Sequence, residues 1–218
     1  MAATVVAVNS TWDTNTANAT QYREAFVQGL FSAPQFALNE LKGADASQPK
    51  AGAAASDPSV AYITGVCHGT SDIFTGDQDN PVFVAGAVDK ATFEGKIVHF
   101  LACNTGALLG RKIADPGIGG AKAFFGYSGL FTWPDDGDSQ YADTFFDCDA
   151  EIDRALAGGS TAGTAMQRTL TLYANKIAFL KSKGDPTSLR IAALLDANRS
   201  ILCGPLVDNE YGSSGATL

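Results

Sequence analysis

Two apolar runs of strand length, residues 60–66 and 97–101, constrain most strongly what this chain can fold into. Both contain several β-branched residues and are too short for typical helices, which predicts two buried strands. The residues between them are numerous enough for the crossover connection that a parallel pair needs. Because further apolar runs alternate with helical patterns, we expect an α/β fold whose mostly parallel sheet has helices on both faces.

A reactive side chain follows each of these two runs. His68-Gly69 comes after the first, and Ala102-Cys103 comes after the second. The carboxyl ends of parallel strands meet at one edge of a sheet, and neighbouring strands lie about 4.8 Å apart. Histidine can accept the proton of a thiol and later protonate a leaving amine. The pattern therefore predicts a nucleophile, Cys103, beside a base, His68, with the N–H groups of Gly69 and Cys103 as oxyanion donors.

The order of these motifs resembles that of the caspase-fold (clan CD) cysteine peptidases. This group includes caspases, legumains, gingipains, clostripains, separases and the bacterial CHAT domains, and residues 101–106 look most like the CHAT version. The similarity continues in residues 120–129, 192–199 and 201–205, so that it covers roughly residues 60–206. The resemblance implies a three-layer caspase-like fold and a cysteine endopeptidase that forms an acyl-enzyme, needs no cofactor and acts on a peptide or protein.

The resemblance also implies where a substrate would bind. In the family, the residue two before the nucleophile helps to line the primary pocket, and an acidic residue there accompanies basic substrates. That position is Leu101 here, so this signal is absent. The family holds its peptide near the end of the next strand, which implies that a substrate lies extended beside Ser128 and Gly129 as an added strand.

The loop after that strand carries one aromatic and three acidic candidates. Trp133 could form an apolar wall, and the aspartates could pair with a basic substrate side chain, so that cleavage would follow Arg or Lys. The aspartates are Asp135, Asp136 and Asp138. The alternative is a solvated acidic turn. A calcium site is poorly supported because the spacing of the aspartates matches no complete loop motif.

Length and composition favour one domain over residues 1–218. Residues 42–59, rich in Ala, Gly, Ser and Pro, are expected to form a mobile surface loop, and residues 211–218 to fray. Residues 73–88 are expected to form a β-hairpin or flap next to His68. The net charge of −8 argues against nucleic acid or an anionic membrane as the main partner. Without a membrane-span pattern or a charged signal region, a cytoplasmic location is expected.

The remaining cysteines and the second histidine favour structural roles. The four cysteines form no disulfide framework by spacing, and the absence of a C-x-x-C pair argues against zinc; no metal is expected. Strand alternation turns Cys67 away from the face that His68 uses, while Cys148 and Cys203 fall in apolar patterns. His99 lies inside the second apolar run and is expected to be a core residue with its hydrogen bonds satisfied.

Two other functions fit the same residues. The chain could be a binding or signalling module that keeps the fold without turning over peptides. It could also be a different acyl-transfer enzyme, a ligase or thioesterase, that uses the same dyad. An activating protein partner is a further possibility for a peptidase whose flap closes the site.

Overall fold

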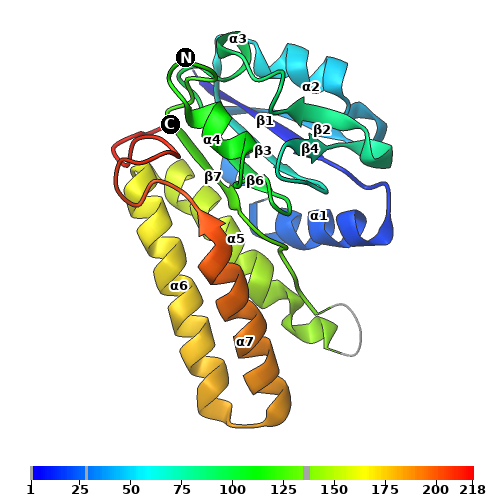
Figure 1. The fold of residues 1–218 in the computed structure, drawn as a ribbon. Coiled ribbons are helices and arrows are strands. Elements are labelled where there is room, and N and C mark those ends of the chain that lie inside the picture. The colour runs from blue at the N-terminus through cyan, green and yellow to red at the C-terminus, as the bar shows by residue number, and fades with distance from the viewer. Residues whose placement is uncertain (1, 28, 135–137) are drawn as a thin grey trace.

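A six-stranded sheet forms the centre of the computed structural model, which describes residues 2–27, 29–134 and 138–218 (Figure 1). The strand order is β2-β1-β3-β6-β7-β8, and every neighbouring pair is parallel except β7 and β8. The strands are β1 (Ala3–Asn9), β2 (Phe36–Lys42), β3 (Val60–Val66), β6 (Ile97–Leu101), β7 (Ala123–Tyr127) and β8 (Leu202–Cys203). This mostly parallel sheet confirms the predicted α/β class.

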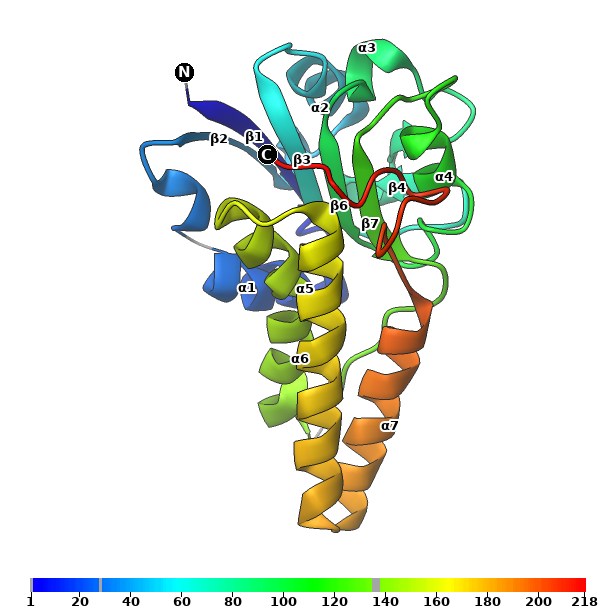
Figure 2. The same cartoon turned by 90° about the vertical axis from the view of Figure 1, so that its left-hand side faces the viewer.

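Helices cover both faces of the sheet and make three layers (Figure 2). On one face, α1 (Thr14–Val27) and α5 (Ala142–Ala157) lie on the sheet, while α6 (Ala162–Lys183) packs on α5, and α7 (Pro186–Ile201) packs on α6 and extends with it beyond the sheet. The other face packs against α2 (Gln48–Ala55), α3 (Lys90–Phe93), α4 (Leu109–Ala114) and a hairpin of β4 (Ile73–Thr75) and β5 (Pro81–Val84). Short 3-10 turns span Leu30–Ser32, Gly43–Asp45, Asp77–Asp79 and Ser139–Tyr141.

Alternation along each strand divides the core between the two faces. Leu101 packs with the α1 and α5 side, whereas Phe100 packs with the α2 and α4 side. The same alternation puts Val66 on the α1 side and Cys67 on the opposite side, as predicted. Residues that follow Val66 and Leu101 by two positions therefore return to the α1 face.

The register between β3 and β6 aligns the two predicted reactive residues. Val66 is the parallel partner of Leu101, and the Cys67 N–H donates to the Leu101 carbonyl across 3.3 Å. His68 and Cys103 each lie two residues beyond this pair. Both therefore sit at the carboxyl edge of the sheet, beside the start of α1.

The prediction of a loop over residues 42–59 is wrong for its central part. Residues 48–55 form α2, and Ala51 and Ala55 on this helix are fully buried. Ser47 precedes the helix, and Pro49 lies in its first turn, where a missing N–H costs nothing. The low-complexity composition conceals a helix because alanines spaced by four residues pack closely on the sheet.

The C-terminal residues 211–218, for which fraying was expected, pack against the body of the protein. The Tyr211 side chain is buried, and its carbonyl accepts a hydrogen bond from the Phe124 N–H on β7. The carbonyls of Ser214 and Ala216 accept from the first N–H groups of α6, at Gly163 and Ala162. The segment thus satisfies donors that a helix start otherwise leaves open.

Among the helices that the structure describes, none is long and apolar enough to cross a membrane.

Candidate functional site

His68 is held from two sides at the end of β3. Its Nε2 lies 2.6 Å from Oδ2 of Asp13, which follows β1. Its backbone carbonyl accepts hydrogen bonds from both the N–H and the hydroxyl of Thr75, each at 3.1 Å, on the β4–β5 hairpin. The predicted flap is therefore a true hairpin, and it fixes the backbone of the candidate base.

Asp13 has a second role as the cap of α1. Its Oδ1 accepts the Thr16 N–H across 2.9 Å, while Oδ2 faces His68. Burial favours a raised pKa for Asp13, but the hydrogen bonds from Thr16 and His68 outweigh it, so the pKa of this carboxyl lies below its ordinary value. Asp13 is thus ionised at neutral pH and suited to fix the proton of His68 on Nε2. Among the described residues, Nδ1 of His68 makes no hydrogen bond.

Cys103 is half-buried in the turn that follows β6. Its thiol approaches the Phe131 carbonyl, with Sγ and O separated by 3.8 Å. Burial raises the pKa of Cys103 above its ordinary value, and the contact with Phe131 only partly offsets this. The resting group is therefore a neutral thiol, which needs a base such as His68 to become a nucleophile.

The backbone around Cys103 is tightly constrained. Asn104 has a φ of 60°, a left-handed conformation that asparagine tolerates better than most residues, and its N–H donates to the Gly129 carbonyl. Gly69 packs against this turn so closely that a Cβ at residue 69 would lie 2.6 Å from the Cys103 carbonyl oxygen. The N–H groups of Gly69 and Cys103 donate to no acceptor on another residue in the described ranges. Gly69 does not line the cavity that holds Cys103, but lies in a neighbouring hollow that shares His68 with it.

A cavity of about 180 Å³ brings His68 and Cys103 together, as the sequence predicted. Leu101 and Trp133, both predicted as substrate-binding residues, also line it. The Trp133 ring packs against Phe146 of α5, with the ring centroids 5.3 Å apart. The remaining lining residues are Asn15, Thr16, Ala19, Val66, Cys67, Ala102 and Phe131.

Two predicted peptide-binding residues lie outside this cavity and already use part of their backbone. The Ser128 N–H donates to the Ile201 carbonyl across 2.8 Å, and the Gly129 carbonyl accepts from Asn104. These groups form part of the protein's own β7–β8 edge. An added peptide strand could pair only with the other backbone groups of Ser128 and Gly129.

The structure describes one of the three aspartates in the loop after β7. Asp138 forms an ion pair with Arg190 of α7, so its charge already has a partner. Asp135 and Asp136 lie outside the described residues.

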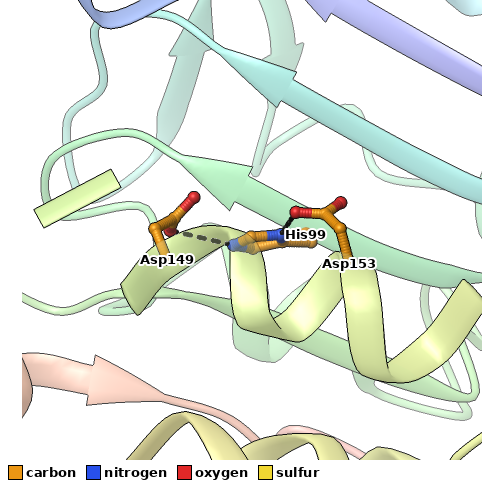
Figure 3. A group of neighbouring side chains, drawn as sticks. All are labelled: His99, Asp149 and Asp153. Atoms are coloured by element: carbon orange, nitrogen blue, oxygen red, sulfur yellow. Dashed lines mark hydrogen bonds and ion pairs between the residues drawn. The ribbon is translucent and has the colours of Figure 1, made fainter. Parts of the chain in front are cut away.

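A buried ionic cluster lies on the same sheet face as the cavity, between β6 and α5 (Figure 3). Both ring nitrogens of His99 face carboxylates: Nε2 is 3.1 Å from Asp149, and Nδ1 is 3.2 Å from Asp153. Arg23 of α1 also contacts both carboxylates, at 3.2 and 2.7 Å. Burial alone would lower the pKa of His99, but the two aspartates raise it to about 9. His99 is thus a fully buried core residue with its hydrogen bonds satisfied, as predicted.

The side chains of His99, Asp149 and Asp153 offer possible metal-ligand atoms within 4.8 Å of one another. Two features favour an ion-pair network over a metal centre. Arg23 and protonated His99 together balance the two carboxylate charges, and a single metal ion would use only one of the two engaged nitrogens of His99. Through Arg23, the cluster connects α1 to α5 and to the sheet. Asp13 caps the start of this same helix.

The other three cysteines are free and buried. Burial strongly raises the pKa of Cys67 and of Cys148. Cys203 lies against the turn that follows β6, where a Cβ on Gly106 would approach its Sγ to 2.9 Å. These positions fit the predicted packing roles.

Comparison with known proteins leaves the family open: no protein-family model matches the chain, and no curated protein matches it in sequence.

Proposed function

We propose that this protein is a cysteine endopeptidase of the caspase-fold type, with Cys103 as nucleophile and His68 as general base. One observation carries the proposal. A half-buried thiol and an imidazole share one cavity at the carboxyl edge of a parallel sheet, and a carboxylate lies behind the imidazole. Nucleophile, base and orienting group are the three parts that acyl transfer by a thiol requires.

Attack begins when the Cys103 thiol turns from the Phe131 carbonyl towards His68. Nδ1 of His68 accepts the thiol proton as Sγ bonds to the substrate carbonyl carbon, and negative charge develops on the carbonyl oxygen. The N–H groups of Gly69 and Cys103 donate to that oxygen. Asp13 stabilises the imidazolium through Nε2.

The peptide C–N bond then breaks, and the imidazolium gives its proton to the leaving nitrogen. This leaves an acyl-enzyme with a thioester bond to Cys103. A water molecule attacks the thioester while His68 accepts its proton, and the proton returns to Sγ as the acid product leaves. No redox partner or cofactor enters this sequence.

The four free cysteines fit a reducing compartment, for which we propose the cytoplasm. The substrate would be a peptide or an exposed segment of a protein.

A cleavage screen tests the proposal. Parent protein, Cys103→Ala and His68→Ala would be incubated with a mixed peptide library, and the products identified by mass spectrometry. Cleavage by the parent that disappears in both variants, with folding retained by circular dichroism, supports the dyad. Cys148→Ala is the matched control, because it removes a thiol on α5 that is not part of the cavity.

Cleavage that persists in Cys103→Ala would contradict the assignment. A folded parent that cleaves nothing would favour the binding module over the peptidase.

A further inference from the structure

The cavity at Cys103 is large enough to hold a substrate side chain. Its volume of about 180 Å³ slightly exceeds that of apolar cavities of about 150 Å³ that accept a benzene ring. It therefore has room for one side chain of leucine, methionine or phenylalanine size. A side chain held here belongs to a residue adjacent to the bond that Cys103 attacks.

Apolar side chains from three parts of the fold build this cavity. Val66 and Leu101, partners in the β3–β6 register, contribute from the sheet, and Ala19 contributes from α1. Phe131 and Trp133 contribute from the segment after β7. The small side chain of Ala19 is what keeps the space open on the α1 side, because a larger residue there would project into it.

The described lining offers no partner for a charged side chain. Apart from His68 and the two thiols, the polar groups of the lining side chains are those of Asn15 and Thr16 and the indole N–H of Trp133, and none of these is charged. Asp13 precedes the lining residue Asn15 by two positions, but its two oxygens are engaged with Thr16 and His68. A buried charge that finds no counter-charge binds poorly, and the start of α1 additionally disfavours a cation. The loop aspartate that the structure describes, Asp138, is paired with Arg190.

We infer that this cavity selects an uncharged apolar residue immediately before the scissile bond. The inference rests on the proposed peptidase function and specifies its substrate class. It differs from the expectation of a basic residue, which relied on the acidic loop.

Peptidyl acyloxymethyl ketones test the inference directly on the full-length protein. The probes would share the same preceding residues and differ only in the last one: Leu, Phe, Ala, Arg or Asp. Rates of Cys103 modification would be followed by intact mass and peptide mapping. We expect Leu or Phe to react at least about tenfold faster than Arg, Asp or Ala, as a filled apolar pocket predicts.

The outcomes separate the two claims. Fastest modification by the Arg or Asp probe would overturn the apolar pocket and leave the peptidase proposal standing. No modification of Cys103 by any probe would overturn both.

Two cavity variants then identify the selecting residues. Leu101→Asp is expected to raise the Arg rate relative to the Leu rate at least about tenfold, because it supplies a carboxylate inside the cavity. Leu108→Asp, the same change at an exposed leucine that is not part of the lining, is the control and should leave the ratio unchanged. Ala19→Leu, which fills the cavity without adding charge, is expected to slow the Leu and Phe probes more than the Ala probe. Unchanged ratios in a folded Ala19→Leu variant would contradict the location of the pocket.

Discussion

Oδ2 of Asp13 lies 2.6 Å from Nε2 of His68, although 55 residues separate them in the chain. The contact exists because β1 and β3 are parallel neighbours, so the residues after both strands meet at one edge. The same carboxylate caps α1 through Thr16. A single aspartate thus connects the start of a helix to the orientation of the candidate base.

Asp13→Asn tests this connection. The amide oxygen can keep the cap on Thr16, while the amide NH₂ faces His68 and donates to Nε2. This forces the imidazole proton onto Nδ1, where the base needs a lone pair. We expect kcat for peptide cleavage to fall by about 10²–10⁴-fold with little change in thermal stability. Asp13→Glu, which restores the carboxylate, should recover part of the activity. Wild-type kcat in Asp13→Asn would rule out an orienting role.

Gly69→Ala tests the packing of the proposed oxyanion donors. The new Cβ would lie 2.6 Å from the Cys103 carbonyl oxygen and 2.7 Å from the Thr105 methyl carbon. Either the backbone at residue 69 or the turn at residues 103–105 must therefore move. We expect kcat to fall at least about tenfold and the protein to lose about 1–3 kcal/mol of stability. Gly86→Ala is the control because a Cβ there meets nothing within 4 Å. Equal behaviour of the two variants in kinetics and urea unfolding would contradict this packing argument.

The ionic cluster predicts a loss of stability at alkaline pH. The pKa of His99 is raised from 6.5 to about 9 in the folded protein, so between these values the folded state binds a proton that the unfolded state has lost. The stabilisation is complete below pH 6.5 and declines as pH rises through about 9. The expected loss is about 3 kcal/mol.

Urea unfolding of the parent and of His99→Gln at several pH values between 6 and 9.5 measures this effect. The variant should be less stable than the parent at pH 6. Its free energy of unfolding should also fall less steeply than that of the parent as pH rises from 6.5 to 9. Parallel curves for the two proteins would show that His99 does not carry the charge.

The placement of His68 and Cys103 in one cavity was predictable because it depends on local pattern and simple topology. An apolar run followed by His68, and another followed by Cys103, need only parallel pairing to bring the two residues to one edge. The core role of His99 was predictable for a similar reason, since it lies in the middle of a buried strand. In contrast, its partners Asp149 and Asp153 come from α5, and no local pattern indicates which strand that helix covers.

Asp13 was missed although the sequence contains a signal for it. Asp13 precedes Thr16 by three residues at the start of a helix, which is a capping pattern, and it follows a predicted strand. Its second contact depends on β1 lying next to β3, and strand order is not encoded locally. The C-terminal segment was misjudged for a related reason: its Gly and Ser content suggested fraying, while Tyr211 anchors it against Phe124 and the Gly106 carbonyl.

The most direct test of the account is the reactivity of Cys103 and its dependence on His68. Folded parent protein and His68→Ala would be treated with a limiting amount of a thiol alkylating agent at pH 7, and each cysteine quantified by peptide mapping. We predict that Cys103 in the parent reacts at least about tenfold faster than Cys67, Cys148 and Cys203, and that His68→Ala removes most of this advantage. Equal reactivity of Cys103 in the two proteins would contradict the claim that His68 activates the thiol.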